Sequence, residues 1–106
     1  MNRPARLSPA AQREFAKALR EMEHVVAAER LKHAVADAVK RLGENPFLGS
    51  ARPHLPPPFR FWSLVRFGYV LVYDPGTVPV EILRFVHTKR DLPRVLAELR
   101  DLPESH

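Results

Sequence analysis

Cysteine is absent from this chain of 106 residues. Its absence excludes a disulfide framework, a thiolate nucleophile and a zinc ribbon. Long apolar runs are missing too: no stretch approaches the ~18–20 residues that cross a bilayer, and residues 1–6 lack the apolar segment of a signal peptide. The length suits one domain of about 100–150 residues and excludes a two-domain enzyme with its own cofactor fold. We therefore expect a single soluble, cytoplasmic domain over residues 1–106 that makes no membrane contact.

Acidic residues are also scarce, and unevenly so. The chain has 17 Lys and Arg against 12 Asp and Glu, a net charge of +5, and no acid lies between Glu44 and Asp74. The same stretch contains Arg52, Arg60 and Arg66. This concentration of positive charge indicates an anionic partner, either the phosphates of a nucleic acid or an acidic protein.

The first half of the chain carries two helical patterns after a short extended piece. Ser8 followed by Pro9 is typical of a helix N-cap, and apolar residues then recur at spacings of four, three and four as far as Val26. The next apolar set is out of phase with the first. We therefore expect a break at residues 27–30 and a second helix that ends at Gly43 in a left-handed C-cap. The two helices should lie antiparallel along a shared apolar seam.

The second half begins with a stiff loop. Five prolines and one glycine at residues 45–58 exclude a helix or an interior strand there. Apolar alternation then predicts strands at 59–67, 69–73 and 80–87, which an antiparallel meander closes most simply. Residues 92–102 fit a short amphipathic helix. The whole order predicts an α+β fold in which an N-terminal strand and a helical hairpin pack on a small antiparallel sheet, with a short C-terminal helix.

Four segments of the chain form a sequence signature. Each segment alone is unspecific, but the four in this order are specific. They are Leu7 to Ala11, Leu42 to Gly49, Arg66 to Tyr73 and Val80 to Leu92. Together they resemble the RelE/ParE superfamily of toxins from bacterial toxin–antitoxin modules, and the closing strand with its His-x-x-Arg-Asp-Leu is most similar to the ParE branch. The resemblance implies a toxin silenced in a hetero-oligomer by a ParD-like antitoxin, a ribbon-helix-helix protein whose disordered C-terminal segment folds across the toxin.

The resemblance implies one of two mechanisms. ParE-like members poison DNA gyrase by binding, whereas RelE-like members cleave mRNA on the ribosome without a metal. The closing segment favours the first, so we expect a gyrase inhibitor that needs no cofactor and no metal and has no enzymatic activity of its own. The alternatives are a ribosome-dependent mRNA endoribonuclease and a homologue that has lost toxicity and only forms complexes.

Metal-free RNA cleavage needs an acid, a base and cations for the developing charge on the phosphorane. If the chain is a ribonuclease, the catalytic residues are Arg66, Arg84 and His87, with His87 as acid or base and the arginines as phosphate clamps. Two features weaken this interpretation. A threonine follows His87 where ribonucleases often have an aromatic residue, and the proline-rich loop offers only Arg52 and His54.

Several of these residues also have a structural interpretation. His87 shares a strand face with apolar residues and suits a histidine bonded to backbone or to a carboxylate. Asp91 is placed to cap the last helix and Arg90 to pair with a carboxylate, while Tyr73 suits a half-buried position with its hydroxyl in water. In a binding protein, the residues that we expect to contact the partners are Arg52, Arg60, Arg66, Tyr73, Arg90 and Asp91.

Overall fold

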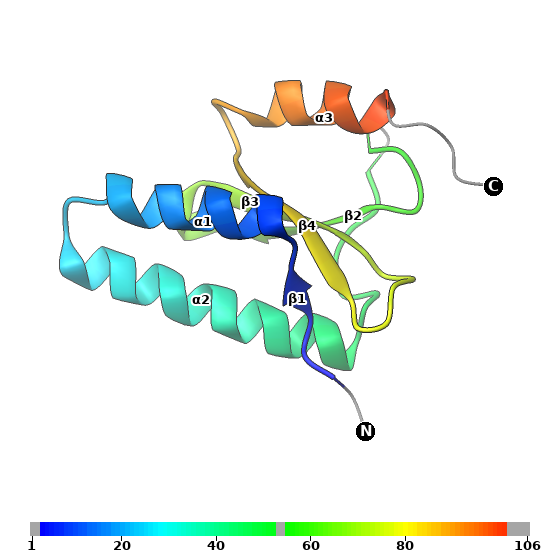
Figure 1. The fold of residues 1–106 in the computed structure, drawn as a ribbon, viewed down its shortest axis with the longest axis horizontal. Helices are drawn as coiled ribbons and strands as arrows, with labels where there is room; N and C mark the ends of the chain where they lie inside the picture. Colours follow the sequence, from blue (N-terminus) through cyan, green and yellow to red (C-terminus); the bar gives the residue numbers. More distant parts are fainter. Residues whose placement is uncertain (1–2, 53–54, 102–106) are drawn as a thin grey trace.

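The computed structural model describes residues 3–52 and 55–101. The elements, in chain order, are β1 (Arg6–Leu7), α1 (Pro9–Glu21), α2 (Val25–Glu44), β2 (Arg60–Leu64), the 3-10 turn η1 (Val65–Phe67), β3 (Tyr69–Asp74), β4 (Glu81–His87) and α3 (Leu92–Arg100). One sheet holds the strands in the order β1-β4-β3-β2, and α1 and α2 run side by side as a hairpin (Figure 1). The α+β fold, the hairpin and the C-terminal helix are thus confirmed. His54 and Leu102 lie outside the described residues.

The sheet is mixed. Strands β2, β3 and β4 pair antiparallel, as predicted, but β1 pairs parallel to β4 with Arg6 opposite Glu81. The backbone N–H groups of Arg6 and Ser8 donate to the carbonyls of Val80 and Ile82, both at 2.8 Å. The predicted antiparallel meander is therefore confirmed for β2, β3 and β4, and β1 extends the sheet in parallel. A strand of two residues has too little alternation for its direction to be read from sequence.

Helix α1 begins where the sequence predicts. The Ser8 Oγ accepts a hydrogen bond from the Ala11 N–H at 3.1 Å and donates one to the Leu83 carbonyl at 2.7 Å, so the cap also fixes the helix to the sheet. The predicted break at 27–30 is wrong, because α2 already begins at Val25 and continues through it. Val26 is 61% exposed and does not continue the apolar stripe of α1, which is why its spacing misplaced the break.

Gly43 lies inside α2 and is not a left-handed C-cap, so that prediction is also wrong. The helix ends at Glu44. A Cβ atom at position 43 would lie 2.8 Å from the Pro4 Cα and 2.9 Å from the Ala5 nitrogen, and closer still to the Arg3 carbonyl oxygen. The segment before β1 therefore crosses directly over α2 at the one position without a side chain. There the Ala5 N–H donates to the Val39 carbonyl at 2.9 Å.

Strand β2 is shorter than the predicted 59–67. After Leu64 the chain turns through η1, and Gly68 closes the turn at φ 73° with its N–H donating to the Val65 carbonyl. Val65 is 84% exposed, outside the alternation that its sequence position suggested. Arg66 consequently lies outside the strand that holds Arg60, although the predicted strand 59–67 contained both.

Strand β4 contains a bulge at Leu83. The register with β3 shifts between Val72 and Tyr73, so that Leu83 is the extra residue on its strand. Strict alternation predicted that Ile82 and Val86 share a face. The bulge inverts the alternation, and the two side chains belong to different buried clusters.

The sheet is buried on both faces. The first cluster joins α1 and α2 to the sheet and includes Ala18, Leu31, Leu42, Leu71, Tyr73, Ile82 and Phe85. The second joins the proline-rich loop and α3 to the opposite face and comprises Leu55, Phe61, Val70, Val72, Val86, Val95 and Leu99. Central strand β3 serves both clusters, which explains its continuous apolar run. Within the described ranges, no helix has both the length and the apolar character to span a membrane.

Candidate functional site

Arg84 on β4 is held by carboxylates from two helices. Its Nε lies 3.1 Å from both carboxylate oxygens of Glu14 on α1, its Nη2 lies 2.8 Å from Glu14 Oε2, and its Nη1 lies 2.7 Å from Glu98 Oε2 on α3. Glu14 also accepts the Phe85 backbone N–H at 3.1 Å. The hydrogen bonds that Arg84 donates to Glu14 raise the pKa of Arg84 above its ordinary value, and the one that it donates to Glu98 adds to the effect. Arg84 therefore links α1, β4 and α3.

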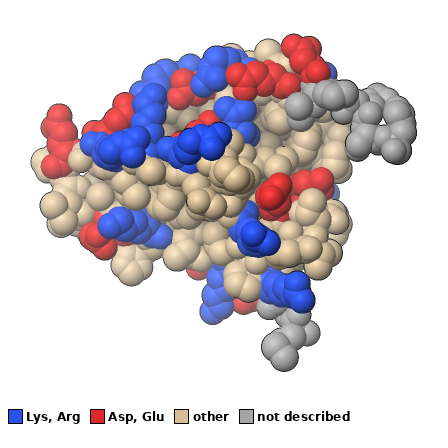
Figure 2. All heavy atoms as spheres, viewed as in Figure 1, with Lys and Arg blue, Asp and Glu red and all other residues tan. Residues whose placement is uncertain are grey.

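Further ion pairs continue from this link along α3. Arg94 reaches Glu98 at 2.9 Å and Asp91 at 3.8 Å, while Arg90 reaches Asp91 at 3.1 Å and Glu21 at 3.7 Å. Figure 2 shows the resulting interleaved positive and negative side chains over α3. Arg90 thus pairs with carboxylates as predicted. Asp91 occupies the N-cap position of α3, but its carboxylate makes no capping hydrogen bond because it faces the two arginines.

His87 ends β4 in a row of aromatic rings. Its ring meets Tyr69 edge to face with centroids 5.3 Å apart, and Tyr69 stacks on Phe85 at 4.6 Å. The His87 Nδ1 accepts the Arg90 backbone N–H at 3.1 Å, a bond to backbone of the kind that the structural interpretation expects. Only Nε2 is left to meet a ligand, at the edge of a hollow that Glu14, Glu21 and Asp91 help to line.

Tyr73 is fully buried, which corrects the expectation of a hydroxyl in water. The hydroxyl donates to the Pro46 carbonyl at 2.6 Å and accepts the Gly49 N–H at 2.8 Å, because the start of the proline-rich loop folds over it. Burial raises the pKa of Tyr73 above its ordinary value. The side chain therefore pins the loop to the sheet.

Removing the Tyr73 hydroxyl tests whether its hydrogen bonds hold the loop on the sheet. Tyr73→Phe should lower the free energy of unfolding by about 2 kcal/mol, because it leaves the partly buried Pro46 carbonyl and the buried Gly49 N–H without a partner. Urea denaturation measures the loss. The control is Tyr69→Phe, which removes a hydroxyl that makes no hydrogen bond with the described residues and should change stability by less than about 0.5 kcal/mol. Equal losses in the two variants would contradict the role of the Tyr73 hydroxyl.

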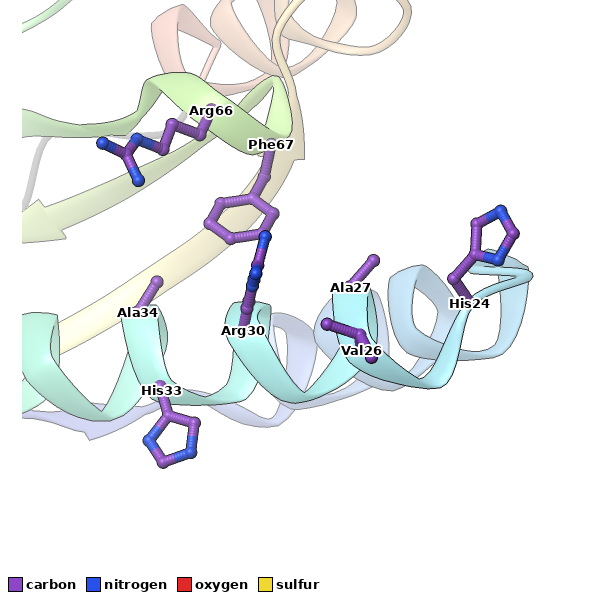
Figure 3. Close-up of a pocket in the computed structure, with 8 residues that line it drawn as sticks. All are labelled: His24, Val26, Ala27, Arg30, His33, Ala34, Arg66 and Phe67. Carbon is purple, nitrogen blue, oxygen red and sulfur yellow. The ribbon is translucent and has the colours of Figure 1, made fainter.

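Arg66 lies on η1 beside a hollow of about 960 Å³ at the N-terminal half of α2. We name it the basic hollow; its lining residues are His24, Val26, Ala27, Arg30, His33, Ala34, Arg66 and Phe67 (Figure 3). The Arg30 side chain rises from α2 toward the Phe67 ring, while Arg66 extends along η1 on the other side of that ring. Neither arginine forms an ion pair with a residue in the described part of the chain, and none of the lining residues is acidic. The sequence interpretation missed Arg30 because it placed a helix break there.

The remaining predicted residues lie elsewhere. Arg60 donates from Nη1 to the Gly49 carbonyl at 2.8 Å, and its guanidinium lies 5.1 Å from the centre of the Phe47 ring. Arg52 lies 5.6 Å from the centre of the Phe61 ring. The predicted binding residues thus occupy three places: the proline-rich loop with the paired ends of β2 and β3 beside it, the basic hollow, and the segment just before α3. Across the described residues, no group of three or more His, Asp and Glu has an arrangement able to hold a metal ion.

Comparison with known families decides the identity of this fold. The model of the family described as ParE toxin of type II toxin-antitoxin system, parDE, matches residues 5–92. The chain belongs to the ParE toxin family. This ParE toxin is therefore the toxin of a type II toxin–antitoxin module. No curated protein matches the sequence.

A solved structure supports the same fold for this ParE toxin. It is described as "Chromosomal ParDE TA system from P. aeruginosa" and superposes with a TM-score of 0.67 at 17% sequence identity. The match covers 81% of this chain and 96% of the other chain. At that identity the likeness shows the fold alone. It does not identify the residues of this ParE toxin that contact partners.

Proposed function

We propose that this ParE toxin inhibits DNA gyrase in the cytoplasm by binding it, and that it performs no chemistry of its own. The observation that carries the proposal is the engagement of Arg84. Its guanidinium is taken up by Glu14 and Glu98, so clamping a phosphate would require breaking those bonds inside the fold. Family membership supports gyrase as the target, since the ParE branch acts on it.

The alternative ribonuclease needs Arg66, Arg84 and His87 around one scissile phosphate. Arg66 lies on η1 at the basic hollow, whereas Arg84 on β4 is bonded to Glu14 of α1 and Glu98 of α3. His87 has one ring nitrogen occupied by the Arg90 N–H. These placements favour binding over catalysis as the mode of toxicity.

The partner that silences the toxin is, in this proposal, a ParD-like ribbon-helix-helix antitoxin, and the basic hollow is its docking surface. Arg30 and Arg66 offer two positive charges that no carboxylate of the described residues pairs, and Val26 beside them is 61% exposed. An antitoxin segment that alternates acidic and apolar side chains would complement both properties. Binding would give a toxin–antitoxin hetero-oligomer.

Two assays separate gyrase inhibition from RNA cleavage. The purified toxin should block DNA supercoiling by gyrase and cause gyrase-linked DNA breaks, and it should leave mRNA intact in a translating extract. His87→Ala should retain gyrase inhibition within about threefold wherever it remains folded, because His87 has only a structural role in this mechanism. Codon-positioned mRNA cuts that disappear in His87→Ala would establish the ribonuclease instead. No effect in either assay would point to a homologue that only forms complexes.

Charge reversal in the basic hollow tests the antitoxin surface. The double variant Arg30→Glu/Arg66→Glu should weaken binding of the cognate ParD-like antitoxin by about 100-fold, since two attractive contacts become repulsive. Isothermal titration calorimetry measures the affinity. Arg13→Glu on α1 reverses one exposed charge outside the hollow and should change the affinity by less than about threefold. Unchanged affinity in the double variant would show that the antitoxin binds another face of the toxin.

A further inference from the structure

The proline-rich loop carries a second surface that the proposed function does not use. Phe47 projects from the start of the loop and is 64% exposed, with the Arg60 guanidinium over one side of its ring. Exposed Arg52 lies nearby over Phe61. We name Phe47, Arg52 and Arg60 the loop platform. It combines an accessible aromatic ring with two cations.

The surroundings of the loop platform favour a negatively charged ligand. The hollow beside it is lined by Phe47, Ala51, Arg52, Leu55, Pro57, Pro58, Phe59, Arg60 and Pro75, of which none is acidic. The nearest acid along the chain from Pro75 is Asp74, whose Oδ1 accepts the Gly76 N–H at 2.8 Å. The two arginines therefore line a hollow in which no lining residue carries a carboxylate.

The loop platform is also held in place before any ligand arrives. Phe47 lies between Pro46 and Gly49, and both of these are hydrogen-bonded to the buried hydroxyl of Tyr73. Arg60 is fixed through its Nη1 bond to the Gly49 carbonyl, which leaves its other N–H groups available. A preorganised platform loses little conformational entropy on binding.

We propose that the loop platform binds single-stranded nucleic acid. A base would stack on the open side of the Phe47 ring, and Arg52 and Arg60 would contact the flanking phosphates. Proteins that hold single strands combine a basic surface with aromatic rings, and stacking on a ring contributes about 1–3 kcal/mol per base. An acidic peptide would use the two cations but would have no need of a flat, exposed ring. The inference is independent of gyrase inhibition, because it concerns another surface and is tested on the isolated chain.

Fluorescence anisotropy with labelled oligo(dT) and oligo(rU) of about 15 nucleotides tests the inference. The toxin should bind the single strands, and affinity should fall as salt rises. The tighter of the two ligands identifies DNA or RNA as the preferred strand. Phe47→Leu, which keeps an apolar side chain without a ring, should weaken binding by about tenfold, whereas Phe47→Trp should retain or strengthen it.

Charge variants complete the test. Arg52→Gln should weaken binding and reduce the dependence on salt by about one phosphate contact. Arg13→Gln, a matched loss of charge on α1, should leave the affinity within about twofold. The inference is overturned if the wild-type chain does not bind either strand, if Phe47→Leu binds like wild type while circular dichroism shows both folded, or if polyglutamate displaces the strand as well as unlabelled oligo(dT) does. The last result would assign the loop platform to an acidic protein.

Discussion

Gly43→Ala should destabilise this toxin by about 2 kcal/mol, even though alanine is favoured over glycine inside a helix by about 1 kcal/mol. A Cβ atom at position 43 would overlap the backbone at Arg3, Pro4 and Ala5. Overpacking typically costs about 1–3 kcal/mol and more where the neighbour cannot yield. The segment could retreat only by giving up the bonds from the Ala5 and Arg6 N–H groups to Val39 and Val80. Urea denaturation measures the net loss.

Gly76→Ala is the matched control for this substitution. A Cβ atom at Gly76 would meet only a carboxylate oxygen of Asp74, at 3.2 Å, and this side chain can shift. Its stability should change by less than about 0.5 kcal/mol. Amide hydrogen exchange adds a local measurement, because protection at Arg6 and Ser8 should fall in Gly43→Ala as β1 loosens. A Gly43→Ala protein that is more stable than wild type would rule out the close crossing of residues 3–5 over α2.

The second large effect is expected at Arg84. Arg84→Met should lower the free energy of unfolding by about 2 kcal/mol, because Glu14 and Glu98 lose the cation that joins them. Removing one member of a buried pair costs about 3–5 kcal/mol. Here the Arg84 and Glu14 side chains are 20% and 25% exposed, so water relieves part of that cost. Thermal or urea denaturation gives the difference.

Two further variants make the Arg84 result specific. Arg94→Met removes an arginine of the same ion-pair series whose side chain is 59% exposed, and it should cost less than about 0.5 kcal/mol. Arg84→Met/Glu14→Leu removes both members of the Arg84–Glu14 pair and should recover part of the loss, because Glu14 is no longer an unpaired carboxylate and Glu98 keeps Arg94. The recovery should be incomplete, because the Phe85 N–H loses its acceptor. If Arg84→Met is as stable as wild type but loses toxicity, Arg84 acts on a target and not in the fold.

Local chemistry made parts of this fold predictable from sequence. The Ser8 cap and the proline-rich loop depend on residues that are close neighbours in the chain, so the local sequence predicts them. The bulge at Leu83 and the role of Gly43 are not predictable in this way, because each is imposed by a strand or segment that arrives from far along the chain. The spacing of apolar residues along a helix does not show which distant segment will pack across it.

The candidate site, like the fold, was predictable only where it depends on residue type and local sequence. Arg84 and His87 could be named from sequence as ionisable residues at the end of the sheet. The partner that determines what Arg84 can do, Glu14, is 70 residues away and lies on another element. Phe47 carried a weak signal, an aromatic residue beside proline in a stretch without acids, but its exposure became visible only in the folded loop. The sequence thus identifies the ionisable and aromatic residues, but it does not show which of them are free to bind a ligand.

The second buried cluster has a thermodynamic consequence. Leu55 of the proline-rich loop and Val95 and Leu99 of α3 cover one face of the sheet together, so neither segment is closed independently of the other. A ligand that stabilises the loop in this position should make displacement of α3 harder, and a protein that displaces α3 should weaken the packing of the loop on the sheet. By reciprocity, the affinity of a ligand for the loop and the affinity of a protein for α3 are linked by one coupling free energy, although the loop and α3 share no residue.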